Sequence, residues 1–290
     1  MKVAAIQMVS GTQLQTNLER AGALLAEAAA GGAELAVLPE YFCLLGQRDT
    51  DKLQIQEAFG HGLIQDFLAR TARQLNLWIV GGTLPLTAEV PKGQSPLDHG
   101  SPSIVTVGDG SRVRNSTLVF DPSGACVARY DKIHLFRFDN GQERFDESRV
   151  LQPGSEPVLF DLHARDGQRW RIGLSICYDL RFPELYRHYA AQGADLLLVP
   201  SAFTHTTGQA HWELLLRARA VENLAYVLAP AQGGLHANGR RTWGHSLLVD
   251  PWGTVLAEHA EGESVVLGTL DAARLAQCRS QLPALAHRTL

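Results

Sequence analysis

Three short apolar segments of this sequence each end close to a side chain that can move a proton or attack a carbonyl carbon. The segments and side chains are Leu35–Leu38 before Glu40, Ile172–Ile176 before Cys177, and Leu196–Val199 before Ser201. In open α/β sheets, reactive groups collect just beyond the carboxyl ends of the strands. If these segments are strands of such sheets, their ends are predicted to carry the chemistry.

Cys177 and Glu40 carry the strongest indications of chemistry. A free cysteine after an apolar strand is usually a small buried hydrophobic residue. However, Tyr178–Leu185 is typical of a sharp strand-to-helix elbow with Pro183 in the first helical turn, and the N–H groups of a helix start favour a thiolate and can bind an oxyanion. Glu40 precedes two aromatic residues, so partial desolvation would suit it to proton transfer. An exposed loop carboxylate is the alternative.

Other residues give weaker signals. Lys132 is unremarkable by itself, and Ser201 lacks the GxSxG elbow, so we interpret it as structural. His205 and His211 lack a helical i,i+4 relation, and no HExxH spacing occurs. GxGxxG and Walker patterns are also absent from the sequence. The sequence therefore predicts neither a metal nor another cofactor.

Composition restricts the partners and the compartment. The 290 residues carry 26 Lys and Arg against 30 Asp and Glu, a net charge of −4, which offers no basic field for nucleic acid. The four cysteines are scattered without a CxxC pair, which argues against disulfides and a Cys-rich zinc module. The apolar runs are too short for a signal peptide or for the ~20 residues of a membrane span. We expect a cytoplasmic protein that binds neither nucleic acid nor membrane.

The elements that must position these side chains alternate between strand and helix. The first half is predicted as strand Val3–Met8, a helix ended by Gly31-Gly32, strand Leu35–Leu38, helix Leu63–Leu75 and strand Trp78–Val80. Thr16 and Glu19 are predicted to form the capping box of the first helix. This order favours an α/β sandwich whose strands are covered on both faces.

The rest of the chain continues this pattern within one predicted domain, residues 1–290. Residues 88–114 are predicted as a surface excursion, either over the site entrance or at an oligomer edge, and 138–154 as a polar loop. The other predicted elements are a hairpin of Leu118–Phe120 with Cys126–Tyr130, strands Arg171–Ile176 and Leu196–Val199, helices Pro183–Ala191 and Ala210–Leu224, and C-terminal strands at Ala225–Leu228, Ser246–Asp250, Thr254–Ala257 and Ser264–Leu270.

Three motifs around the candidate residues resemble the signature segments of the nitrilase (carbon–nitrogen hydrolase) superfamily. They are Leu38–Phe42, Tyr130–Phe136 and Ser175–Leu185, in the order found in the family. The resemblance extends from Ala4 to Pro283. It implies a four-layer αββα sandwich and, because such chains commonly pair, a homodimer or higher homo-oligomer.

The resemblance implies a role for each reactive side chain. Cys177 would attack an amide carbonyl and form a thioester, while Glu40 would act as general base and then as acid. Lys132 and the Tyr178 backbone N–H would stabilise the oxyanion. Family members carry a second glutamate after the lysine, and the segment Phe-Asp-Glu-Ser favours Glu147. Glu143 is the alternative for this position.

Further segments resemble the Nit branch, which contains ω-amidase and deaminated-glutathione amidase. These segments are Pro200–Thr204, Thr206–Glu213, Ala231–Gly234, Gly244–Ser246 and Val249–Thr254, and the last three favour the second activity. The branch implies that Arg181 pairs with a substrate carboxylate. Tyr41, Phe203 and Thr207 would line the substrate pocket, although Phe203 also suits simple core packing.

The predicted function is a cysteine-dependent amidase for a small carboxylate-bearing amide, such as deaminated glutathione. An ω-amidase acting on α-ketoglutaramate or succinamate is the alternative. The same residues would also serve an acyltransferase that passes the acyl group to an amine, or a nitrilase. A binding protein that keeps the fold without turnover is disfavoured by the intact Glu40, Lys132 and Cys177.

Overall fold

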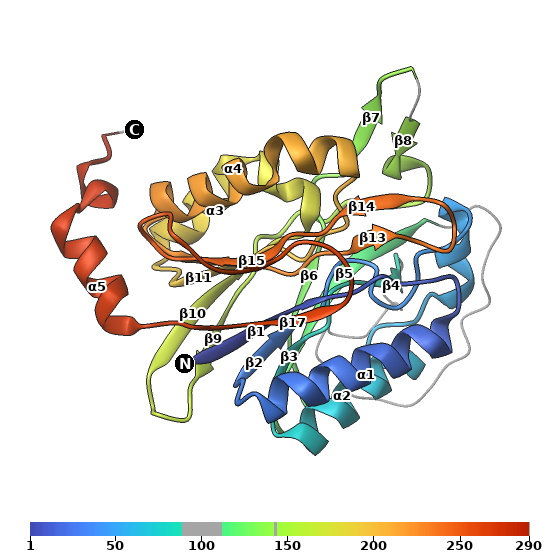
Figure 1. The fold of residues 1–290 in the computed structure, drawn as a ribbon, viewed down its shortest axis with the longest axis horizontal. Coiled ribbons are helices and arrows are strands. Elements are labelled where there is room, and N and C mark those ends of the chain that lie inside the picture. Colours follow the sequence, from blue (N-terminus) through green and yellow to red (C-terminus); the bar gives the residue numbers. More distant parts are fainter. Residues whose placement is uncertain (89–111, 142–143, 290) are drawn as a thin grey trace.

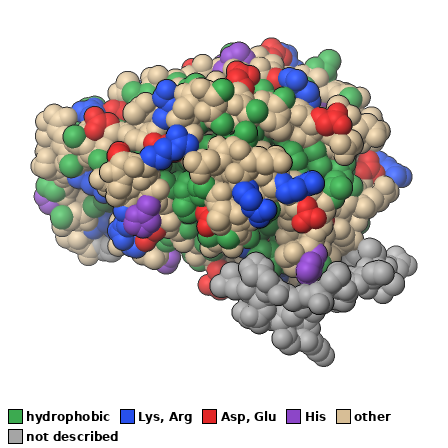
Figure 2. Space-filling view, turned by 90° about the horizontal axis from the view of Figure 1, so that it is seen from below, with side chains coloured by type: hydrophobic (Ala, Val, Ile, Leu, Met, Phe, Trp, Pro, Cys, Tyr) green, Lys and Arg blue, Asp and Glu red, His purple; other side chains and the backbone are tan. Residues whose placement is uncertain are grey.

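The protein consists of two β-sheets packed face to face, each covered on its outer side by two helices (Figure 1). The structure is a computed structural model that describes residues 1–88, 112–141 and 144–289. The predicted four-layer αββα sandwich is therefore confirmed. Figure 2 shows basic and acidic side chains interspersed on the face seen from below. Within the described residues, no helix is both long and apolar enough to span a membrane.

The first sheet places β1, β2 and β3 parallel and side by side, with Ala5 opposite Val37 in the register of β1 and β2. Its strand order is β17-β1-β2-β3-β5-β4, and β6 pairs with β5. The strands are β1 (Lys2–Gln7), β2 (Leu35–Val37), β3 (Trp78–Val80), β4 (Leu84–Thr87), β5 (Val113–Phe120), β6 (Cys126–Asp131) and β17 (Ser264–Thr269).

The second sheet repeats this arrangement with β10, β11 and β12 parallel at its centre. Its order is β16-β15-β12-β11-β10-β9, and its strands are β9 (Leu159–His163), β10 (Arg169–Leu174), β11 (Leu196–Leu198), β12 (Tyr226–Ala229), β15 (Ser246–Val249) and β16 (Val255–His259). Two further hairpins pair β7 (Arg137–Asp139) with β8 (Arg144–Asp146) and β13 (Gly233–Leu235) with β14 (Arg241–Trp243).

The helices explain why the central strands are apolar on both faces. All residues of β2 and β11 are buried apolar side chains, as expected for parallel strands covered on both sides. The outer layers are α1 (Leu14–Ala30) with α2 (Leu63–Leu75) and α3 (Pro183–Ala191) with α4 (His205–Asn223), while α5 (Ala272–Gln281) lies at one end (Figure 1). Short 3₁₀ helices are η1 (Asp49–Ile55), η2 (Glu147–Arg149), η3 (Cys177–Arg181) and η4 (Ala284–His287).

The predicted start of the first helix is wrong. α1 begins at Leu14, and its N-cap residue Gln13 makes no side-chain capping bond, so Thr16 lies inside the helix. The reason is Asn17, whose amide accepts from Gly11 N–H at 2.8 Å and donates to Gly11 O at 2.9 Å. This reciprocal contact holds the preceding loop from within the helix, and the predicted capping box does not form.

Three other expectations need correction. Part of 138–154 is not loop, because β7 extends to Asp139 and because β8 and η2 occupy Arg144–Arg149. α4 begins at His205 and not at Ala210, because the Thr204 side chain accepts from Thr207 N–H at 3.3 Å and caps the helix. The helix α5 was not predicted. Of the predicted excursion, residues 89–111 lie outside the described residues, and Val113 and Arg114 belong to β5.

Candidate active site

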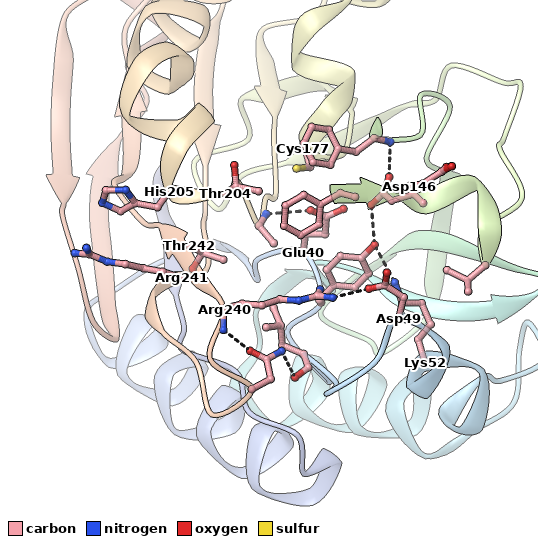
Figure 3. A pocket seen from close by; sticks show the side chains of 18 of the residues that line it. Glu40, Asp49, Lys52, Asp146, Cys177, Thr204, His205, Arg240, Arg241 and Thr242 are labelled. Atoms are coloured by element: carbon pink, nitrogen blue, oxygen red, sulfur yellow. Dashed lines mark hydrogen bonds and ion pairs between the residues drawn. The ribbon is translucent and has the colours of Figure 1, made fainter. Parts of the chain in front are cut away.

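The ends of β2 and β10, one from each sheet, face a common cavity of about 470 Å³. Glu40 follows β2, Cys177 follows β10, and Glu147 opens η2; all three line this cavity. Lys132 follows β6 and contacts both glutamates. Figure 3 shows Glu40 and Cys177 facing the same space. The structure thus brings together four residues that lie far apart in the sequence.

Glu40 is held as a hydrogen-bond acceptor. Its Oε1 accepts from Lys132 Nζ at 2.9 Å and from Asn115 Nδ2 at 2.8 Å, and its Oε2 accepts from the Ala202 backbone N–H at 3.0 Å. A carboxylate that receives only donors is arranged for its ionised form. The turn behind it needs a glycine, because a Cβ at Gly82 would collide with the Pro39 carbonyl, and Gly82 has a φ of +49°.

Lys132 forms a buried ion triad with two carboxylates. Its Nζ lies 2.9 Å from Glu40 Oε1 and 2.9 Å from Glu147 Oε2, and its side chain is 1% exposed. Burial alone would lower the pKa of Lys132, but Glu147 and Glu40 outweigh it and hold this pKa well above the usual value. Burial would raise the pKa of Glu147, yet Lys132 and the Phe136 N–H keep it below its usual value. Lys132 and Glu147 therefore stay charged at neutral pH.

The β7–β8 hairpin explains why Glu147 reaches Lys132. Pairing of Arg137 with Asp146 returns the chain so that Glu147 lies beside Phe136. Glu147 N–H donates to Phe136 O at 3.0 Å, and Phe136 N–H donates to Glu147 Oε2 at 2.7 Å. Glu147 therefore contacts Lys132 in the triad, whereas the alternative Glu143 lies outside the described residues.

Cys177 occupies the elbow that the sequence predicted. Its φ is +49°, its N–H donates to Pro200 O at 3.0 Å, and Pro183 is the first residue of α3. Burial, followed by the charge of Glu40, raises the pKa of the Cys177 thiol well above its usual value. The sulfur is therefore a thiol at neutral pH and needs a base before it can attack. Tyr178 is the second residue of η3, and because the first N–H groups of a helix have no partner within it, its N–H can serve as a donor at this helix start.

Asp179 ties the Cys177 elbow to the segment that carries Lys132. Its Oδ2 accepts from Tyr130 Oη at 2.6 Å and from Ile176 N–H at 2.9 Å, while its Oδ1 accepts from His134 N–H at 3.0 Å. The Asp179 side chain is fully buried. Because these donors lie on either side of Lys132 and beside Cys177, one carboxylate fixes the relative position of ammonium and sulfur.

Arg181, Phe203 and Thr207 line a second, smaller recess of about 20 Å³ that also reaches Cys177. The Arg181 guanidinium lies over the rings of Tyr178 and Phe203, 5.8 and 5.7 Å from their centroids. No carboxylate among the described residues forms an ion pair with it. Phe203 is also part of the core, because its ring packs 4.9 Å from that of Trp212.

Tyr41 lines the larger cavity, but its hydroxyl group contacts the ion triad. Tyr41 Oη donates to Glu147 Oε1 at 2.9 Å and accepts from Lys52 Nζ at 3.5 Å. Its φ is +57°, and its N–H donates to Thr83 Oγ1 at 2.9 Å. The predicted pocket residue therefore also holds the second glutamate in place.

Sequence reasoning missed several residues of the site. Asn115, Asp179, Lys52 and Arg240 carry no motif that distinguishes them from other polar residues, although Asp179 lies inside the segment that resembles the family signature. Ser201, interpreted as structural, donates its hydroxyl to Val199 O at 3.0 Å. The strand end that carries Ser201 contributes to the site through the Ala202 backbone N–H, which donates to Glu40 Oε2. No cluster of three or more metal-ligating side chains occurs in residues 1–88, 112–141 and 144–289.

Comparison with known proteins identifies the family of this fold and site. The sequence matches the family model of carbon–nitrogen hydrolases over residues 2–280. The chain belongs to this family. This carbon–nitrogen hydrolase is 38% identical over 287 residues to a deaminated glutathione amidase of Synechocystis sp. (strain PCC 6803 / GT-S), which covers 98% of the chain and 97% of the relative. It is 35% identical over 283 residues to omega-amidase NIT2 of Pongo abelii, covering 97% and 92%.

A solved structure agrees with these sequence relatives of the hydrolase. The crystal structure of Saccharomyces cerevisiae Nit3, a member of branch 10 of the nitrilase superfamily, superposes with a TM-score of 0.81. It shares 29% sequence identity, and the alignment covers 98% of this chain and 94% of that chain. The predicted superfamily, its fold and the prediction of an amidase-type carbon–nitrogen hydrolase are thereby confirmed.

Proposed function

We propose that this hydrolase cleaves a small carboxylate-bearing amide of the deaminated glutathione type through a thioester on Cys177. The supporting observation is that a buried thiol and a carboxylate held as an acceptor line one cavity, with the buried Lys132 ammonium bonded to that carboxylate. Each group alone is ordinary. Together they supply a nucleophile, a proton acceptor and a cation for the developing oxyanion.

In the first half of the reaction, Glu40 takes the proton from the Cys177 thiol while the sulfur bonds to the amide carbon. The carbonyl oxygen becomes an oxyanion. Lys132 has three donors and gives two contacts to carboxylates, so the third donor and the Tyr178 N–H can bind this oxygen. One such donor is typically worth about 3 kcal/mol. Glu40 then returns its proton to the nitrogen, the carbon–nitrogen bond breaks, and the amine leaves.

In the second half, water replaces the amine. Glu40 takes a proton from the water as its oxygen attacks the thioester carbon, and the same two donors hold the new oxyanion. The carbon–sulfur bond breaks, the sulfur regains the proton from Glu40, and the carboxylic acid leaves. Glu147 does not touch the reacting atoms in this scheme. It is a positioning residue that, held by Tyr41, orients Lys132.

Arg181 supports the proposal of a carboxylate in the acyl half of the substrate. Its guanidinium borders the recess that reaches Cys177 and lies over two aromatic rings. A planar guanidinium binds a carboxylate through two parallel hydrogen bonds. Thr207 and Phe203 border the same recess and would flank the end of the acyl half that reaches Arg181.

A release assay tests the function and separates it from its closest alternative. Deaminated glutathione, α-ketoglutaramate and succinamate are supplied to the purified protein, and the released amine or ammonia is measured against a Cys177→Ala background. We expect the highest kcat/KM with deaminated glutathione. A preference for α-ketoglutaramate would favour an omega-amidase, the activity named for the relative from Pongo abelii. Release from none of the three would contradict the proposed function.

Assembly and compartment belong to the same proposal. The family match over residues 2–280 supports a single domain.

Large hydrophobic side chains are exposed at Leu214 and Val221 of α4 and at Trp252, which supports a homo-oligomeric assembly. The scattered free cysteines are consistent with action in a reducing cytoplasm.

A further inference from the structure

Cys177 lies at the junction of two hollows that differ in size. The recess of about 20 Å³ reaches Arg181, whereas the cavity of about 470 Å³ extends from Cys177 to Lys52 and Arg240. In an amide, the acyl chain and the nitrogen leave the reacting carbon in different directions. If the acyl carboxylate pairs with Arg181, as proposed above, the nitrogen and its substituent therefore lie in the larger cavity.

The larger cavity has room for much more than an ammonia leaving group. Ammonia has one heavy atom, whereas pockets of about 300–1,000 Å³ hold ligands of drug size. A volume of about 470 Å³ therefore has room for an amine with many atoms, such as an amino acid or a dipeptide. The volume does not indicate the charge of this amine. The charged side chains that line the wall of the cavity do.

Lys52 is the cation of this wall that lacks a carboxylate partner. The two arginines are each paired, Arg240 with Asp49 at 2.7 Å and Arg241 with Glu261 at 3.4 Å. Lys52 forms no ion pair within 4.0 Å among the described residues. Its Nζ makes a long contact of 3.5 Å to Tyr41 Oη and lies 4.5 Å from the centre of that ring. Figure 3 shows Lys52 beside Asp49, across the cavity from His205 and Arg241.

The environment of Lys52 leaves its positive charge incompletely compensated. Burial lowers the pKa of Lys52, and the more distant Glu147, Asp49 and Glu40 oppose this only in part, while Lys132 repels it. An ammonium with donors to spare gains most from a directly bonded anion, because charge-assisted hydrogen bonds are about twice as strong as neutral ones. A carboxylate arriving through the cavity would provide that bond.

We propose that Lys52 is the residue that binds the leaving-group carboxylate, which in deaminated glutathione is the glycine carboxylate, and that Lys52 thereby sets the preference for a charged amine half. Arg240 lies beside this subsite and keeps guanidinium donors that Asp49 does not use. The substrate then carries one carboxylate on each side of the scissile bond, facing Arg181 and Lys52. This inference rests on the proposed amidase function and names the residue that recognises the amine half of its substrate.

The test compares two substrates that differ only in the leaving-group charge. Deaminated glutathione ends in a glycine carboxylate, and its C-terminal amide is uncharged there. We expect the wild-type protein to cleave the free acid with a kcat/KM about 10-fold or more above that of the C-terminal amide. In Lys52→Met this ratio should fall to about 1, whereas Lys52→Arg should keep most of it. Because the two substrates are compared within one variant, a general loss of activity caused by losing the Lys52–Tyr41 contact cancels in the ratio.

Lys2→Met serves as the matched control, because Lys2 lies at the surface and donates to Gly31 O. Its ratio should equal that of the wild type. A wild-type ratio near 1, or an unchanged ratio in Lys52→Met, would overturn the assignment of Lys52 while leaving the amidase function intact. If the wild type cleaved neither of these substrates nor α-ketoglutaramate or succinamate, the proposed function would fail and this inference with it.

Discussion

The two strand ends that meet at the cavity have the same backbone plan but opposite surroundings. Glu40 and Cys177 each lie three residues beyond a central parallel strand, β2 ending at Val37 and β10 ending at Leu174. Each turn contains a non-glycine residue with positive φ, 57° at Tyr41 and 49° at Cys177. The first sheet surrounds its carboxylate with donors, whereas the second buries a thiol beside a carboxylate.

This difference shows how the two sheets divide the chemistry. Three donors keep Glu40 ready to accept a proton. Burial and the charge of Glu40 keep Cys177 protonated, because both raise its pKa. The Cys177 sulfur is therefore a thiol that needs a base, and in the proposed scheme this base, Glu40, comes from the other sheet. The following predictions test this division.

The largest expected effect comes from removing the sulfur of the second sheet. Cys177→Ala should lower kcat by about 10⁴-fold or more, because no other group in the scheme can form the thioester. The thermal midpoint should change by no more than about 4 °C, since one small buried side chain is trimmed. Kinetics and calorimetry on the same preparation check both statements. Substantial turnover by this variant would contradict the division of roles.

The next effect concerns the charge balance of the first sheet. Lys132→Met should lower the free energy of unfolding by about 3–5 kcal/mol, because Glu40 and Glu147 would remain as buried carboxylates without their cation. Urea unfolding at pH 8 measures this loss. In the wild type, Glu147 has a lowered pKa, so its contribution to stability is present above the unfolded pKa and fades as pH falls through the folded one.

Without Lys132, the two carboxylates instead repel each other and favour protonation, so the stability deficit should shrink between pH 8 and pH 5. Lys2→Met provides the control for loss of a lysine, and it should change stability by less than about 0.5 kcal/mol. A deficit for Lys132→Met below about 1 kcal/mol, or one that grows with acid, would argue against the buried triad.

The smallest effect tests the coupling between the two strand ends. Glu40→Gln should make Cys177 react faster with iodoacetamide at pH 8, by about tenfold for each unit by which the thiol pKa falls. The reason is that the charge of Glu40 raises that pKa. Turnover should drop by about 10²–10⁴-fold at the same time, because the general base is lost. If Glu40→Gln were less active and also reacted more slowly with iodoacetamide, the prediction that the charge of Glu40 raises the pKa of the Cys177 thiol would be contradicted.

Peptide mapping by mass spectrometry assigns the alkylation to a single cysteine. This matters because burial raises the pKa of the Cys126 thiol to about 11, so Cys126 is a slow internal reference in the same sample. The ratio of Cys177 to Cys126 modification is therefore the quantity to compare between wild type and Glu40→Gln.

Much of the architecture could be predicted from local signals. Apolar runs such as Leu196–Val199 identified the central strands, and Pro183 marked the start of α3. The capping pattern at Thr16 misled because Asn17 holds the preceding loop through a non-capping contact. The β7–β8 hairpin was missed because each strand is a single Arg-Phe-Asp triplet, too short for the alternation over about 4–8 residues that predicts a half-buried strand.

The amino-acid sequence by itself determined the layers of this protein and the identity of its reactive side chains, because periodicity, turn residues and signature segments act within a few positions of the chain. Only the tertiary structure decided that Glu40, Glu147 and Cys177 line one cavity and that the buried Lys132 joins the two glutamates. It also decided that Asp179 and Lys52 lie around this group. The physical reason is that charge compensation depends on distances in space. Residues far apart in sequence acquire their ionisation states, and thus their chemistry, only where the two sheets meet.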